Sequence, residues 1–240
     1  MSPPALPPPD PRIRVVATFA ELAATPLVAP CQAICWRRTP SGDYDEVGRA
    51  LVDAALVAAR GITVLDEPLL DALPLSPAGR TAVATLRADL AALRALGADP
   101  VLECVRGAPR DDDPILPTDV YSWHVDRADL PAATWLCSYT APASEGLFPG
   151  DATRAIDDPP LRARLRAQFG AGDDAAFPAF LAEHSYDLHY RPRPGARPFS
   201  FGVGNLWKLA LQHPGATVPP LVHRAAEDLP GLPPRLLLIA

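Results

Sequence analysis

Apolar residues recur every three or four positions in the N-terminal half of the chain, which is the period of an amphipathic helix. The clearest stretch is 76–96, whose apolar face comprises Val83, Leu86, Leu90, Leu93 and Leu96. Ser76 can cap this helix, Pro77 fits its first turn, and Gly97 ends it. Shorter helices are expected within residues 17–27 and 43–60.

The pattern changes after Pro100 to short runs of β-branched and aromatic residues, which are typical of strands. Strands are expected at 31–38, 101–105, 120–126, 134–140, 199–203, 206–212, 221–225 and 235–240. Helical patches near 160–169 and 174–184 interrupt this series. The chain therefore reads as α+β, with a helical N-terminal half and a β C-terminal half that carries a helical insertion at about 145–198.

Two parts of unequal size follow from this plan. Residues 1–12 are rich in proline and are expected to form a disordered arm. Residues 13–240 are expected to form a single domain, because the helices need the β structure to bury their apolar faces.

Charge and composition exclude some classes of function. The formal net charge is −6, and the arginines are interleaved with acids, so the basic stripe of a nucleic-acid-binding protein is missing. Membrane spans need about 20 consecutive apolar residues, and the sequence contains no such run. The start of the chain does not have the layout of a signal peptide, so the cytoplasm is the expected location. A small molecule is the expected partner, and the oligomeric state stays open.

The strongest chemical signal is His124-Val125-Asp126, in a strand-like run. Residues two apart on a strand project to the same face, so this imidazole and this carboxylate can bind one ion together. His223, in another strand-like run, is the expected third ligand. Two histidines and one carboxylate form a facial triad that leaves coordination positions open and is typical of non-haem iron(II). The alternative is that the histidines are unrelated and lie far apart in space.

A centre of this kind can use 2-oxoglutarate as a co-substrate, and two cations are candidates for binding its distal carboxylate. Arg235 begins the last predicted strand, and a guanidinium binds a carboxylate through two parallel hydrogen bonds. Lys208 lies within an apolar run and either points inward to an anion or reaches solvent. A solvated arginine at an edge strand is the competing interpretation of Arg235.

The segment 184–194 (HSYDLHYRPRP) concentrates polar and aromatic side chains and can form a lid over a binding site. An exposed polar turn held by its prolines is the competing interpretation. The expected substrate contacts are Trp123, Tyr139, His189 and Tyr190.

Several of these motifs together resemble the bacterial domain of unknown function 1826 family. The resemblance covers His124-Val125-Asp126 followed by 135–139 and Ala141-Pro142, the segment 204–208, Val222-His223-Arg224 with 235–238, and the early segment 33–38. The chain departs from the family pattern between Glu145 and Pro198, which affects the expected substrate pocket more than the metal ligands.

The motif order of that family is similar to that of iron(II)- and 2-oxoglutarate-dependent oxygenases. The resemblance implies their double-stranded β-helix, a cupin-like jelly-roll barrel, and their dioxygenase chemistry on an unidentified small molecule. Under this hypothesis, His124, Asp126 and His223 bind Fe(II), while Arg235 or Lys208 binds the co-substrate 2-oxoglutarate. The alternative is a non-enzymatic metal-binding barrel that handles metal and needs no carboxylate partner.

Overall fold

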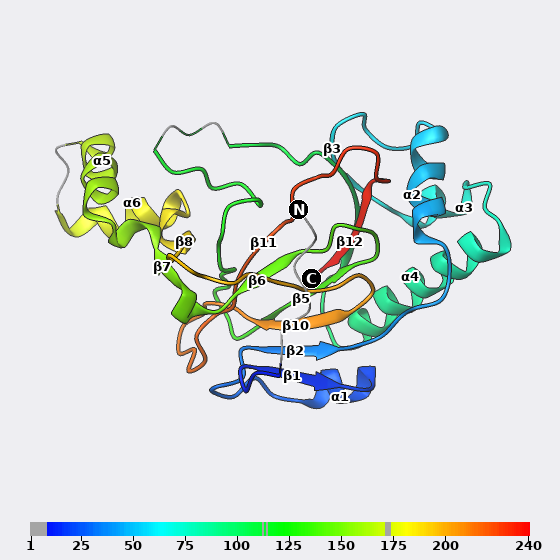
Figure 1. The fold of residues 1–240 in the computed structure, drawn as a ribbon, viewed down its shortest axis with the longest axis horizontal. Coiled ribbons are helices and arrows are strands. Elements are labelled where there is room, and N and C mark those ends of the chain that lie inside the picture. The colour runs from blue at the N-terminus through cyan, green and yellow to red at the C-terminus, as the bar shows by residue number, and fades with distance from the viewer. Residues whose placement is uncertain (1–8, 112, 114, 171–173) are drawn as a thin grey trace.

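A large β-sheet lies at the centre of the fold in this computed structural model. The structure describes residues 9–111, 113, 115–170 and 174–240. The large sheet is mixed and has seven strands (Figure 1). In spatial order they are β1 (Ile13–Val16), β2 (Ala33–Trp36), β10 (Leu206–Ala210), β5 (Ala133–Ser138), β12 (Arg235–Ile239), β4 (Val101–Arg106) and β3 (Gly61–Val64). The pair β1–β2 is parallel, and the other neighbours are antiparallel.

Two smaller sheets complete the β structure. The three-stranded sheet has the order β11 (Val222–Arg224), β6 (Glu145–Leu147) and β9 (Phe199–Ser200). The two-stranded sheet pairs β7 (Ala152–Arg154) with β8 (Tyr190–Pro192).

The helices are α1 (Phe19–Ala24), α2 (Tyr44–Asp53), α3 (Glu67–Asp71), α4 (Pro77–Ala95), α5 (Pro159–Phe169) and α6 (Phe177–Glu183). Short 3-10 turns occupy Pro149–Asp151, Ala155–Asp157, Asp174–Ala176 and Tyr186–Leu188. The longest helix, α4, begins after the cap Ser76, whose hydroxyl accepts the Gly79 N–H at 3.2 Å. The chain leaves α4 at Gly97, whose φ is +82°.

The large sheet buries both of its faces, as the alternation along β10 and β12 shows. Leu206, Leu236 and Leu238 belong to a core cluster that they share with α2 and α4. The intervening Trp207 and Leu237 belong to a second cluster, which also contains Phe199 of the three-stranded sheet. Because successive strand residues point to opposite faces, the large sheet packs against helices on one side and against the smaller sheet on the other.

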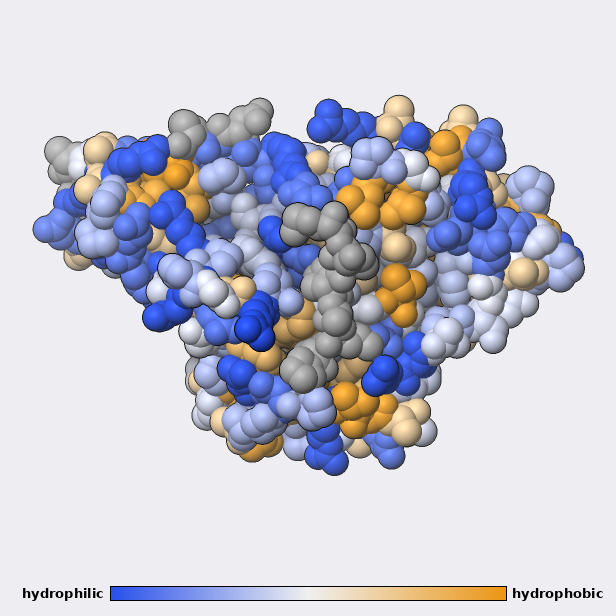
Figure 2. Space-filling view, in the orientation of Figure 1, coloured by the Kyte–Doolittle hydropathy of each residue, from blue (hydrophilic) through white to orange (hydrophobic). Residues whose placement is uncertain are grey.

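The helices α5 and α6 lie apart from α2–α4, in a lobe that projects at the left of Figures 1 and 2. Leu161 and Leu165 of α5 pack there against Phe177 and Leu181 of α6. Figure 2 shows hydrophobic residues on this lobe, beside a surface that is hydrophilic over much of the view.

The α+β class is confirmed, and so is the order of helices and strands over most of the chain. The predicted helices at 76–96, 160–169 and 174–184 correspond to α4, α5 and α6. The jelly-roll barrel is not shown, because no sheet closes among the described residues. The prediction of a regular strand at 120–126 was wrong. In this segment, His124 forms isolated bridges instead of a continuous ladder.

Other boundaries also differ from expectation. The second helix ends at Asp53 rather than near residue 60, and β1, β3 and α3 were not predicted. The expected insertion at 145–198 contains β6, which pairs with β11 and so belongs to the sheet structure. The predicted arm 1–12 falls largely outside the described residues, apart from 9–12, where Asp10 pairs with Arg12.

In the part of the chain that the structure describes, no helix has both the length and the apolar character needed to cross a membrane.

A buried ion pair connects α4 to the segment that follows β2, through Asp89 of the helix and Arg38. Arg38 donates to both carboxylate oxygens of Asp89, one of them at 2.8 Å, and Asp89 also accepts the Tyr139 hydroxyl at 2.6 Å. The side chains of Arg38 and Asp89 are only 11% and 7% exposed. Removal of one partner would therefore leave the other as a buried charge without a counter-ion.

We therefore expect Asp89→Ala to lower the free energy of unfolding by about 3–5 kcal/mol, because it leaves the buried Arg38 charge without a partner. Urea denaturation followed by circular dichroism measures the change. The matched control is Asp71→Ala, which breaks an exposed pair of Asp71 with Arg87 on α4 and should cost less than about 1 kcal/mol. Equal losses in the two variants would contradict this assignment.

Candidate metal centre

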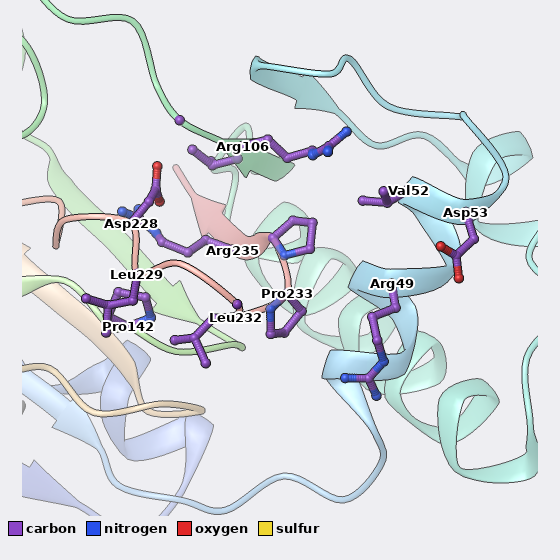
Figure 3. A pocket seen from close by; sticks show the side chains of 14 residues that line it. Arg49, Val52, Asp53, Arg106, Pro142, Asp228, Leu229, Leu232, Pro233 and Arg235 are labelled. Atoms are coloured by element: carbon purple, nitrogen blue, oxygen red, sulfur yellow. The ribbon is translucent and has the colours of Figure 1, made fainter.

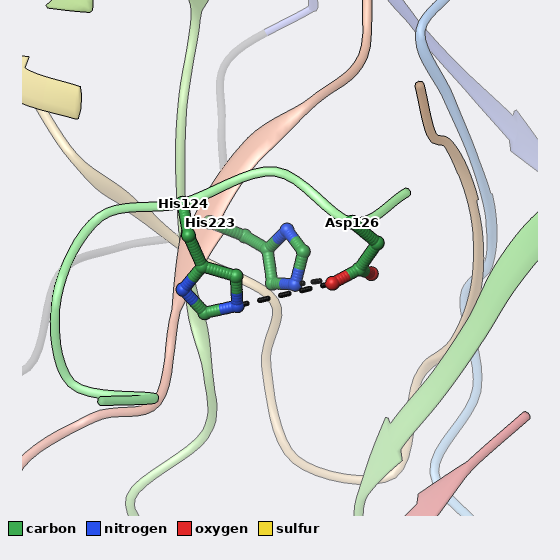
Figure 4. A group of neighbouring side chains, drawn as sticks. All are labelled: His124, Asp126 and His223. Atoms are coloured by element: carbon green, nitrogen blue, oxygen red, sulfur yellow. Dashed lines mark ion pairs between the residues drawn. The ribbon is translucent and has the colours of Figure 1, made fainter. Parts of the chain in front are cut away.

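The three predicted ligands meet at one point. His124, Asp126 and His223 each offer a donor atom, and these atoms lie within 4.8 Å of one another (Figure 4). The Nε2 atom of His223 lies 3.5 Å from Asp126 Oδ2, and that of His124 lies 3.9 Å from Oδ1. The two imidazole centroids are 4.6 Å apart. The reading in which the histidines lie far apart is therefore wrong.

Backbone pairing brings the two histidines together. The His124 N–H donates to the His223 carbonyl at 2.9 Å, and the His223 N–H donates back to the His124 carbonyl at 2.8 Å. Side chains of directly opposed residues in an antiparallel pair project to the same face. Asp126 follows two residues later, and its carbonyl accepts the Gln212 N–H at 2.8 Å.

Hydrogen bonds also set the tautomers of both rings. Nδ1 of His124 lies 2.7 Å from the Ser122 carbonyl, and Nδ1 of His223 lies 3.2 Å from the Leu221 carbonyl. A carbonyl oxygen only accepts, so each Nδ1 carries the hydrogen and each Nε2 keeps a free lone pair. This is the arrangement found in metal-binding histidines, whose second nitrogen donates to a backbone carbonyl or a carboxylate.

Burial and neighbouring groups set the protonation states of His124 and Asp126. Burial, together with the neighbouring His223 imidazole, lowers the pKa of His124 to about 4. Burial alone would raise the pKa of Asp126, but His223, the hydroxyl of Thr134 and His124 outweigh it and hold that pKa below its ordinary value. At neutral pH, His124 is therefore neutral and Asp126 is ionised.

A cavity of about 680 Å³ opens beside the triad. Its lining includes His124, Asp126, Arg127, Thr134 and His189. Phe201 lies near His223, and their ring centroids are 6.4 Å apart. Gly146, opposite His223 in the strand pair, makes room for this packing, because a Cβ there would lie 2.4 Å from the Phe199 ring.

Lys208 and Arg235 do not line this cavity. The ammonium of Lys208 donates to the carbonyls of Ala23 and Thr25, and it lies over Trp135, on the sheet face that packs against the helices. Arg235 is buried, and its Nη1 donates to the Ala226 carbonyl at 2.9 Å. It lines a separate cavity of about 340 Å³ (Figure 3). Its Nε has no partner among the described residues.

Of the four expected substrate contacts, the structure brings His189 to the triad. Trp123 alternates with His124 and packs on the opposite face with Val125, where Tyr190 also contacts it. Tyr139 lies on the helix side of the large sheet, stacked on Tyr44 at a centroid distance of 5.2 Å.

Sequence reasoning missed Thr134 and Arg127. The Thr134 hydroxyl donates to Asp126 Oδ2, and Arg127 pairs with Asp187 at the edge of the cavity. Arg127 directly follows the H-x-D motif, which is the one signal that could have found it. Thr134 lies eight residues after Asp126, but no motif marks it, because the contact depends on the path of the chain between the two residues.

Comparisons with models of protein families, with curated proteins and with solved structures find no match.

The pKa of His124 predicts that the metal-free protein loses stability in mild acid. The ring titrates near 6.5 when unfolded and at about 4 when folded, so below pH 6.5 the unfolded chain binds a proton that the folded protein does not. Burial lowers the pKa of His189 too, which acts in the same direction. We expect the free energy of unfolding to be about 2 kcal/mol lower at pH 5 than at pH 7.

Urea denaturation in the presence of a chelator at the two pH values tests this expectation. His124→Asn should flatten the dependence, because it removes the group with the lowered pKa. A metal-free protein that is equally stable at both pH values, or a variant with an unchanged slope, would contradict the prediction.

Proposed function

We propose that this chain is a non-haem iron(II)- and 2-oxoglutarate-dependent oxygenase that acts on a small molecule. The observation that carries the proposal is the convergence of His124, Asp126 and His223, with both Nε2 lone pairs free, beside a cavity. Two imidazoles and one carboxylate suit iron(II) and leave positions open for further ligands.

The residues around the triad fit such a metal. Asp126 supplies a carboxylate that Thr134 orients, and the carbonyls of Ser122 and Leu221 fix the two rings. These residues would hold an iron ion, which would supply the oxygen-activating chemistry. The protein's own part is to hold three ligands rigidly and to exclude water, which the aromatic side chains behind His223 favour. Packing of the smaller sheet on the large one supports a double-stranded β-helix.

Arg235 is the better of the two candidates for the distal carboxylate. It is 3% exposed, its Nε is unpaired, and it shares a strand face with Leu237, which packs between the sheets. Lys208 lies on the other face and is occupied by two carbonyls. The resemblance to the domain of unknown function 1826 family and the cytoplasmic location stay predictions.

A second candidate function is a metal-binding barrel that does not use 2-oxoglutarate. The observation in its favour is that Arg235 lines a different cavity from His124 and Asp126. The cation that does line the triad's cavity, Arg127, is paired with Asp187.

An anaerobic titration of metal-free protein with iron(II), and then with 2-oxoglutarate, separates these functions. We expect the weak visible charge-transfer band of an iron chelate to appear on the second addition, because 2-oxoglutarate would occupy open positions of the metal. His223→Ala should abolish both metal binding and the band. Arg235→Gln should keep metal binding but lower the affinity for 2-oxoglutarate by about tenfold or more, since the ion pair between the guanidinium and the distal carboxylate is lost.

Metal binding without the band would favour the metal-binding barrel. Absence of metal binding in the wild-type protein would contradict both functions.

A further prediction concerns the hydroxyl behind Asp126. Thr134→Val keeps the shape of the side chain but removes the donor to Asp126, and we expect metal affinity to fall about 10- to 100-fold. Isothermal titration calorimetry with Co(II) measures the metal affinity. The control is Thr153→Val, whose hydroxyl is exposed and bonds to the Arg191 carbonyl, and which should leave the affinity unchanged. A Thr134→Val variant with wild-type affinity would contradict this role.

A further inference from the structure

His189 presents a buried polar atom without a partner. The residue is 4% exposed, and its Nε2 makes no hydrogen bond within the described part of the chain. Its Nδ1 lies 2.8 Å from the Ser185 carbonyl and so carries the ring hydrogen. Nε2 of the neutral ring is therefore an acceptor, and a buried acceptor in a native protein ordinarily has a donor.

This acceptor lies next to the metal position. His189 is opposite His124 in an antiparallel bridge, so both rings project to the same face, with centroids 5.9 Å apart. Both residues line the same cavity. His189 does not join the three residues whose donor atoms lie within 4.8 Å of one another. It therefore lies beside the ligand set, where a bound molecule would reach it.

The local backbone holds the ring in this orientation. Ser185 has φ 57° and ψ 13°, the left-handed region that a residue other than glycine adopts at a cost. In this conformation its carbonyl accepts both the His189 Nδ1–H and the Leu188 N–H, the latter at 3.1 Å. Strained residues of this kind cluster at functional sites.

We propose that His189 accepts a hydrogen bond from the substrate, bound beside the metal next to the positions that 2-oxoglutarate would occupy. The substrate then carries an N–H or O–H group at this point. A carboxylate there would face the lone pair of Nε2 and gain no bond. The inference rests on the proposed metal centre and deepens it, because it names a positioning residue and a chemical requirement on the substrate.

A matched pair of metal-chelating probes tests this inference on the Co(II)-loaded protein. Acetohydroxamate and its N-methyl analogue chelate through the same two oxygens, but only the first has an N–H. We expect the wild-type protein to prefer acetohydroxamate by about tenfold, the effect of one buried hydrogen bond. His189→Phe keeps a ring but removes the acceptor, and should reduce this preference to about twofold or less. His189→Gln should restore part of it through the amide oxygen.

The controls separate failure of this inference from failure of the metal centre. His213→Phe changes a histidine whose Nδ1 lies 2.9 Å from the neighbouring Pro214 carbonyl and which does not line this cavity, so it should keep the wild-type preference. If wild-type protein binds Co(II) but His189→Phe shows an unchanged preference, the inference on His189 is overturned and the metal centre stands. Loss of Co(II) from a folded His189→Phe would make His189 a ligand and also overturn it. If the wild-type protein binds no Co(II), the proposed function itself fails.

Discussion

The reciprocal backbone hydrogen bonds between His124 and His223 are the constraint on which the site depends. They join two segments that are distant in sequence, at N···O distances of 2.9 and 2.8 Å. Because directly opposed strand residues share a face, this single pairing sets both imidazoles side by side. His189 is aligned with them through its own bridge to His124. The chemistry of the site thus follows from backbone register, since a slip of one residue in either pairing would turn one ring to the opposite face from its partner.

The sequence predicted the convergence of His124, Asp126 and His223 better than it predicted the residues around them, and the reason is physical. His124 and Asp126 share a face by the two-residue period of extended chain, which is a local property. The helix α4 was likewise predictable, because its cap, its apolar face and its terminal glycine lie within one stretch. By contrast, the partner of Asp126 is Thr134 and the neighbour of His189 is Ser185 in a left-handed conformation. Neither contact follows from spacing along the chain.

The second limit of the sequence analysis was the face of the sheet from which each strand residue projects. Tyr139 was expected at the substrate and Lys208 was one of two candidates for a carboxylate, but both side chains project toward the helices. Tyr139 serves instead in the buried network with Asp89 and Arg38. Which face of a central strand looks toward the smaller sheet depends on where that sheet packs, and a strand buried on both faces gives no polar alternation to reveal it.

The distances within the triad argue against a purely structural cluster. Histidines that served only to anchor a buried carboxylate would bond to it at about 2.7–3.2 Å. Here the Nε2 atoms of His223 and His124 stop at 3.5 and 3.9 Å from the carboxylate oxygens, with their lone pairs free. Two ligands that each lie about 2.0–2.2 Å from a common centre are at most about 4.4 Å apart, so both separations leave room for one ion. The neutral His124 ring presents an open Nε2 lone pair beside the ionised Asp126 carboxylate, so a cation at that centre would suit both groups.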